Sequence, residues 1–254
     1  MTYSSIQLCS SVVLTIFNFI FCSRKGHPKL TSFLIAGFNT VMIWSGIFFI
    51  TWVSNGFSDF GAQNAVRGYV LLPLIMWLEN KIFGIDFREL CDRCAVGPLL
   101  AYAVGHIGCI FAGCCHGFEY EEGTTAYNVA MKLTGTNMLP QQLFESLSAF
   151  ITCAFLFIIF IRKKQDMGGR LLFIMTISYG IQRFFWEFLR DNKKLIVIKE
   201  MAGAVKRNSD GAQAYWGISE LSFWAIAMVV EGIIFLIVLN KIDKKAAEKQ
   251  ALTA

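Results

Sequence analysis

Long apolar runs separated by short charged clusters dominate the hydropathy pattern of the chain. A membrane-spanning helix needs about 20 mostly apolar residues, and about seven segments meet or approach that length: 6–23, 31–53, 67–83, 94–117, 140–161, 168–189 and 215–240. The third segment is the weakest, because it contains Pro73 and is charged at both ends. The pattern predicts an all-α integral membrane protein in which residues 1–254 form a single polytopic domain.

The charges between these segments predict an orientation, because cytoplasmic loops are enriched in Lys and Arg. Basic clusters follow the first segment, precede the fourth, join the fifth to the sixth and follow the seventh, so all of them fall on one side. The other side receives the uncharged N-terminus and an acidic loop at 118–139. We therefore expect the N-terminus outside and the C-terminus in the cytoplasm. The basic loop at 190–214 is an exception, since this topology places it outside.

Composition supports the membrane class and argues against a nucleic-acid partner and a disulfide framework. The chain is 55% hydrophobic and 16% charged, whereas soluble domains carry about 25% charged residues. The net charge of +5 is modest, and the basic residues sit beside apolar runs as juxtamembrane anchors do, so we expect no nucleic-acid partner. Several of the eight cysteines lie in apolar segments, which argues against a secreted disulfide framework.

The stretch 105–117 concentrates reactive side chains at the end of the fourth segment. It contains two of the three histidines and three of the eight cysteines, spaced by glycines. His106 and Cys109 fall on one helical face, with Cys114 and Cys115 near the outer end. Imidazole can act as a general base and a deprotonated thiol as a nucleophile, so all four are candidate catalytic residues. The alternative is that they only fill the core, as small hydrophobes and a satisfied histidine.

No resident metal or cofactor is expected from this pattern. His and Cys are zinc ligands, but their spacing here matches no familiar finger or ribbon. Cys91 and Cys94 form one Cys-x-x-Cys pair without a second, on the opposite face of the membrane from the other cluster. A disulfide involving Cys114 or Cys115 is an alternative state for these thiols.

The sixth segment carries ionisable residues at membrane depth, where they are costly and usually functional. Arg183, Glu187 and Arg190 recur at spacings of four and three, which places them on one helical face. The planar guanidinium matches phosphate oxygens, and a carboxylate can hold it between substrates. The alternative is a structural Arg–Glu pair, with Arg190 as an interfacial anchor.

A second polar group opens the fifth segment. Gln142 and Glu145 lie one turn apart and are candidate substrate-binding residues, although a carboxylate in a first helical turn also suits the helix dipole. Arg67, Ser219 and Glu220 are further candidates for the same cavity.

These residues together resemble the bacterial prolipoprotein diacylglyceryl transferases. The similar elements are the glycine-rich run from Gly105 to Gly117, the Pro-x-Gln-Leu-Phe-Glu sequence at 140–145, and Tyr-Gly-x-x-Arg-x-x-x-Glu-Phe-x-Arg at 179–190. The last motif is the most specific of them. The resemblance adds Tyr179 to the candidate substrate-binding residues.

The resemblance implies a multi-pass enzyme of the bacterial cytoplasmic membrane, open to the outer leaflet and without a cofactor. Such enzymes move the diacylglyceryl group of phosphatidylglycerol to the lipobox cysteine of a prolipoprotein, forming a thioether and releasing glycerol phosphate. Arg183, by position, would hold the lipid phosphate, with Glu187 and Glu145 orienting it. A guanidinium in a cavity that excludes water can stabilise the negative charge that develops on the leaving group.

The chain departs from the family pattern in the glycine-rich run. His106 replaces its first Arg, Cys109 replaces an Asn, and Phe118 replaces its last Arg. A family His-Gly-Gly element is also missing, and Val66-Arg67-Gly68 stands in roughly its place. Two other functions therefore stay open on the same fold: a membrane thiol-redox or metal-binding protein, and a non-catalytic phospholipid-binding or transport module.

Overall fold

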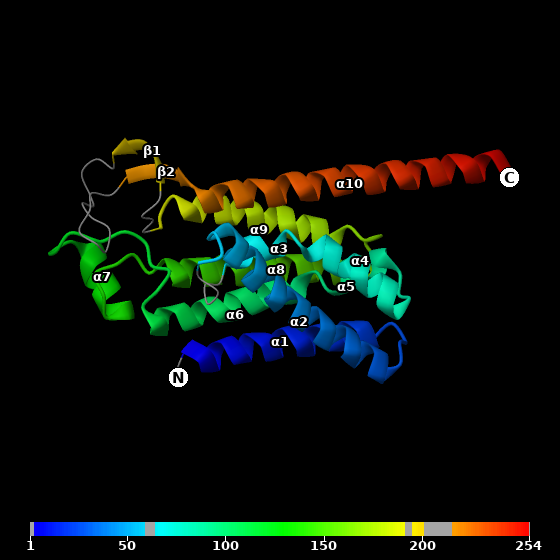
Figure 1. Ribbon diagram of the computed structural model, residues 1–254, viewed down its shortest axis with the longest axis horizontal. Coiled ribbons are helices and arrows are strands. Elements are labelled where there is room, and N and C mark those ends of the chain that lie inside the picture. Colours follow the sequence, from blue (N-terminus) through cyan, green and yellow to red (C-terminus); the bar gives the residue numbers. More distant parts are fainter. Residues whose placement is uncertain (1–2, 59–63, 191–194, 201–214, 254) are drawn as a thin grey trace.

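The computed structural model describes residues 3–58, 64–190, 195–200 and 215–253 as a bundle of long helices (Figure 1). The helices are α1 (Tyr3–Ser23), α2 (Lys29–Ser54), α3 (Ala65–Tyr69), α4 (Leu72–Phe83), α5 (Phe87–Arg93), α6 (Val96–Ala112), α7 (Thr125–Thr134), α8 (Gln141–Arg162), α9 (Leu171–Glu187) and α10 (Glu220–Thr253). Two antiparallel strands, β1 (Leu195–Glu200) and β2 (Tyr215–Ser219), form a small hairpin-like sheet. Lys193, Lys194, Lys206 and Arg207 of the basic loop lie outside the described residues.

Five helices are long and apolar enough to cross a membrane in the part of the chain that is described. They are Ser4–Ser23, Lys29–Ser54, Phe87–Ala112, Gln141–Arg162 and Glu220–Leu252. Their outward faces carry many exposed Leu, Ile, Val and Phe side chains, which suit a lipid solvent in which helices satisfy their own backbone. The expectation of a mostly helical, multi-pass membrane protein is confirmed at this level.

Helix α6 occupies the centre of the bundle, and α10 lies at its edge. In the most apolar 18-residue stretch of Phe87–Ala112, 72% of the residues are buried, against 22% for Glu220–Leu252. Helix α6 packs against α1 and α8, and α9 packs against α10 (Figure 1). His106 and Cys109, the two candidate catalytic residues within α6, are therefore buried among the helices.

The third expected span is not one continuous helix. It is divided into α3 and α4, with a break at Val70 and Leu71. Pro73 lies in the first turn of α4, where its missing N–H costs nothing, whereas in a continuous helix it would leave the preceding turn unbonded. The last expected span also differs, because its first residues, Tyr215–Ser219, form β2 before α10 begins.

Glycines allow α9 and α10 to approach closely. A Cβ atom added at Gly180 would lie 2.8 Å from the carbonyl oxygen of Ala225, and one at Gly232 would lie 2.6 Å from Cγ1 of Ile177. Small residues at helix contacts are typical of membrane bundles, where close backbone approach supplies the packing energy. This contact fixes the rotation of α9, and with it the direction of the Arg183 side chain.

Asp92 anchors the other end of α9. Its carboxylate accepts hydrogen bonds from the backbone N–H groups of Met167 at 2.7 Å, Gly169 at 2.9 Å and Leu171 at 3.0 Å. These bonds tie the α8–α9 turn to α5, at the end of the bundle opposite α7 and the strands (Figure 1). Asp92 therefore stabilises the fold at this end of the bundle.

Candidate functional site

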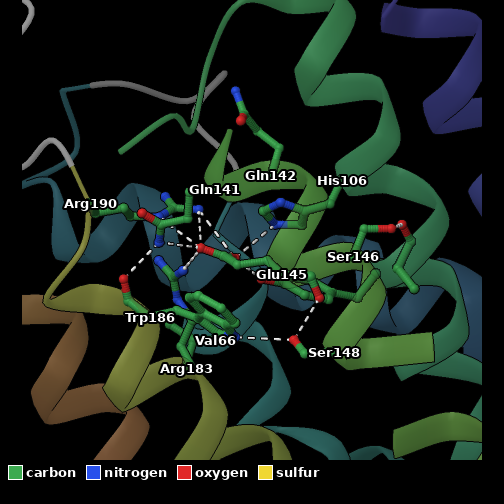
Figure 2. A network of polar contacts seen from close by, with 12 residues as sticks. Val66, His106, Gln141, Gln142, Glu145, Ser146, Ser148, Arg183, Trp186 and Arg190 are labelled. Carbon is green, nitrogen blue, oxygen red and sulfur yellow. Dashed lines mark hydrogen bonds and ion pairs between the residues drawn. The ribbon is translucent and has the colours of Figure 1, made fainter. Parts of the chain in front are cut away.

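The candidate site is centred on the Glu145 carboxylate, near the start of α8 and just after its first turn. Glu145 is only 1% exposed. Its Oε1 atom lies 2.9 Å from Nη1 of Arg183 and 3.2 Å from Nε of Arg190 (Figure 2). Two guanidinium groups therefore share one buried carboxylate, which is an arrangement of charge-assisted hydrogen bonds that holds both cations in place.

Arg183 bridges two acids. Its second terminal nitrogen, Nη2, lies 2.7 Å from Oε2 of Glu187, four residues along the same face of α9. Oε1 of Glu187 accepts a hydrogen bond of 2.8 Å from the Ser219 hydroxyl, at the end of β2. Since Arg183 is 3% exposed and Glu187 1%, these charges depend on one another for their solvation.

Arg190 is positioned by a backbone contact rather than by a helix, because α9 ends at Glu187. Arg190 pairs with Gly117 in an isolated antiparallel bridge, and Gly117 in turn donates its N–H to the carbonyl of Leu139 at 2.9 Å. Three loops thus meet behind the Arg190 side chain. Its Nη2 lies 3.2 Å from Glu145 Oε1, so it belongs to the site and is not merely an interfacial anchor.

Helix α6 contributes an imidazole and a phenol to the same carboxylate. Nε2 of His106 lies 3.5 Å from Oε2 of Glu145. The hydroxyl of Tyr102, one turn earlier, donates a hydrogen bond to the same oxygen. Nδ1 of His106 is buried and has no hydrogen-bond partner among the described residues. Tyr102 was missed in the sequence, although its spacing of four from His106 was an available signal.

The two neighbouring glutamines, Gln141 and Gln142, make different contacts. Gln141 donates from Nε2 to Glu145 at 2.8 Å and to the carbonyl of Trp186 at 2.6 Å. Gln142 points away from Glu145 and donates to the carbonyl of Cys114 at 2.6 Å (Figure 2). Gln141 was missed in the sequence. It lies four residues before Glu145, so the two share a face more closely than a spacing of three allows.

A turn at the end of α6 brings three cysteines together. Gly113 adopts φ of +63°, a left-handed C-cap that glycine favours, and the N–H of Cys114 bonds back to the carbonyl of Cys109 at 3.1 Å. The sulfur atoms of Cys109, Cys114 and Cys115 all lie within 4.8 Å of one another. All three are free thiols.

A cavity opens beside this network. With its open mouth it contains about 730 Å³ of empty space, and its lining includes His106, Cys109, Cys115, Tyr179, Arg183 and Arg190. Glu145, Glu187, Gln142 and Cys114 are not part of its lining. The cations therefore face the cavity with the acids behind them, which is suited to binding an anionic group.

Two of the other sequence candidates are engaged elsewhere. Nη2 of Arg67 lies 2.9 Å from Oε2 of Glu220, and its Nη1 donates to Asn55 at 3.0 Å. These contacts join α2, α3 and α10. Neither Arg67 nor Glu220 is part of the cavity lining.

The fold and the site together define a polytopic helical membrane protein with an arginine-lined cavity. A family model described as prolipoprotein diacylglyceryl transferase matches residues 9–238. The chain belongs to this family.

Individual relatives show how much of the chain is shared. A Clostridium perfringens protein named phosphatidylglycerol–prolipoprotein diacylglyceryl transferase 2 is 30% identical over 194 residues, covering 76% of this chain and 70% of the relative. A Clostridioides difficile protein with the same name, without the numeral, is 23% identical over 216 residues, which cover 81% of this chain and 84% of the relative. A Dehalococcoides mccartyi protein of that name is 29% identical over 133 residues and is matched over only 50% of its length.

Proposed function

We propose that the protein transfers the diacylglyceryl group of phosphatidylglycerol to the cysteine thiol of a prolipoprotein or similar acceptor. The observation that carries this proposal is the pair of buried guanidiniums, Arg183 and Arg190, that converge on Glu145 beside a cavity. Family membership and the names of the relatives support it.

Arg183 and Arg190 bind the lipid phosphate in this proposal. A guanidinium fork matches two phosphate oxygens, and Glu145 and Glu187 keep the forks oriented before the lipid arrives. Tyr179 also lines the cavity, and its ring packs against Tyr102 with centroids 4.9 Å apart, so it shapes the space beside the phosphate. Gln142 acts indirectly, by holding the Cys114 carbonyl and the wall that it belongs to.

The reaction forms one carbon–sulfur bond and breaks one carbon–oxygen bond. The acceptor sulfur attacks the glycerol carbon that bears the phosphate, and the electron pair of the broken bond leaves on glycerol phosphate. The two arginines stabilise the charge that develops on that leaving group. His106 is the proposed base for the acceptor proton, because it lines the cavity and Nδ1 is not engaged by any described residue. In a variant of this route, Cys109, Cys114 or Cys115 carries the group transiently.

The proposed topology is a single polytopic domain of about seven spans in the bacterial cytoplasmic membrane, N-terminus outside. Helices α3 and α4 together form the broken third span, and α9, with 17 residues, is the sixth. The start of α1 and the end of α10 lie at opposite ends of the bundle (Figure 1), which supports an odd number of crossings. The site then faces the outer leaflet, beside α7 and the strands.

A direct assay tests this function. The purified protein is incubated with phosphatidylglycerol labelled in its acyl chains and a peptide containing a lipobox cysteine. We expect a labelled, thioether-linked peptide and one glycerol phosphate released per transfer, with no product from the Cys→Ser peptide. Lipid that binds tightly but is never turned over would instead indicate a binding or transport module and would reject the enzymatic proposal.

Gly117→Ala is expected to impair transfer without removing any polar group. The added Cβ would lie 2.5 Å from the carbonyl oxygen of Leu189 and 2.6 Å from Cδ2 of Leu139, so the segment that carries Arg190 must move. Misplacement by about 1 Å can cost about 100-fold in rate, and we expect a loss of that order in the transfer assay.

Gly37→Ala is the matched control, because a Cβ there would meet nothing within 4 Å. It should keep wild-type activity. Equal activity of Gly117→Ala and Gly37→Ala would show that the position of Arg190 is unimportant.

A further inference from the structure

The three-thiol cluster at the end of α6 has a geometry that direct transfer from the lipid to the acceptor thiol does not require. Cys109, Cys114 and Cys115 place their sulfur atoms within 4.8 Å of one another. Cys109 lies in the last turns of α6 and is 6% exposed, whereas the other two follow the helix. The family pattern described above has an asparagine at the position of Cys109.

The backbone is bent to form the cluster. After the left-handed Gly113, Cys115 also adopts a positive φ of 61°. This conformation is unfavourable for a residue with a side chain and persists only where the surroundings impose it. The bend returns the chain toward α6, and the bond from Gln142 to the Cys114 carbonyl holds it there.

We propose that Cys109, Cys114 and Cys115 bind one thiophilic d¹⁰ cation of the Zn²⁺ type. Zinc–sulfur bonds of about 2.3 Å place tetrahedral sulfur ligands about 3.8 Å apart, which small side-chain rotations can reach from the observed spacing. Thiolate ligands select zinc-like ions over hard cations such as Mg²⁺ and Ca²⁺. Each thiol loses its proton on binding, so up to three protons are released for each ion.

The charge of the occupied site is balanced by a nearby cation. Three thiolates and a divalent cation carry one net negative charge, and Arg190 lines the same cavity as Cys109 and Cys115. The Arg190 guanidinium therefore offsets the net negative charge of the occupied site. Because Cys109 and Cys115 line the cavity, the fourth coordination position is left to solvent or to a thiol that enters from it.

The ion would brace the wall of the proposed lipid site. The turn that it closes carries the Cys114 carbonyl, which Gln142 holds, and leads directly to Gly117, which pairs with Arg190. The inference goes beyond the proposed transfer, because it concerns metal binding by the free protein.

The test uses the full chain in detergent, reduced, stripped with a chelator, and titrated with Zn²⁺ against a chromogenic competitor. We expect one ion per chain, and Co²⁺ in its place should show a thiolate-to-cobalt charge-transfer band. Losing a residue that only hydrogen-bonds to a metal ligand weakens metal binding by up to about 100-fold. Cys109 is proposed as a ligand itself, so Cys109→Ser should weaken Zn²⁺ binding by more than that. Cys153→Ser, which removes a buried free thiol of α8 outside the cluster, should bind as wild type.

Three results would overturn the proposal. They are the absence of bound Zn²⁺, unchanged binding by Cys109→Ser, or a disulfide among these cysteines, found by mass spectrometry, in protein isolated without reductant. The titration contains neither lipid nor peptide. A failed transfer assay therefore leaves this result unaffected, and a failed titration does not bear on transfer.

Discussion

Arg183→Ala is expected to reduce diacylglyceryl transfer by at least about 1,000-fold, the upper range for losing one preorganised transition-state donor. Arg183 combines the proposed phosphate contact with ion pairs to Glu145 at 2.9 Å and to Glu187 at 2.7 Å. Arg183→Lys keeps the charge but loses the fork, so we expect it to recover only a small part of the activity. The labelled-lipid assay measures both variants.

A loss of folding could mimic this result, because Arg183→Ala leaves two buried carboxylates without their shared cation. The double variant Arg183→Ala/Glu187→Gln removes one of those charges and should recover much of the thermal stability but none of the activity. Arg162→Ala, at the exposed far end of α8, is the matched control and should be fully active. Substantial transfer by Arg183→Ala would remove the phosphate role and favour a function centred on the thiols.

Glu145→Gln is expected to have the largest effect on stability. The substitution removes the negative charge that Arg183 and Arg190 share and replaces one of the two acceptor oxygens with an amide donor. Breaking a buried ion pair from one side costs about 3–5 kcal/mol, which for a chain of this size corresponds to a melting temperature lower by roughly 10 °C. Thermal unfolding in detergent, followed by circular dichroism, measures the shift.

Glu231→Gln makes the same chemical change in α10, at a carboxylate whose Oε2 has no hydrogen-bond partner in the described part of the chain. It should change the melting temperature little or raise it slightly, since a neutral amide is easier to bury than an unpaired charge. If Glu145→Gln melts like Glu231→Gln, Glu145 does not organise the two arginines.

The proposed base and the proposed metal site use different residues of the glycine-rich run 105–117. His106 faces Glu145 at 3.5 Å and lines the cavity, whereas Cys114 follows the left-handed turn and is held from α8 by Gln142. Where the family pattern has arginine and asparagine, this chain has an imidazole and a thiol, and the two proposals give them different roles. His106→Ala should therefore reduce transfer while leaving Zn²⁺ binding in place.

The amino-acid sequence by itself determined the membrane class, the main helices and the shared face of Arg183 and Glu187. These follow from apolar run length and from the helical repeat, which are local properties of the chain. It also marked the weak point at Pro73, where α3 and α4 separate, because a missing backbone N–H acts locally.

Only the tertiary structure decided which side chains meet at Glu145, namely Arg183, Arg190, His106 and Tyr102. It also decided that Gln141 rather than Gln142 contacts Glu145, and that three thiols converge. Helical periodicity says which residues share a face of one helix, but not which faces meet. The meeting depends on close contacts between helices, such as Gly180 against Ala225, and on a left-handed turn after α6 that reverses the chain direction. Both are set by packing between segments far apart in the sequence.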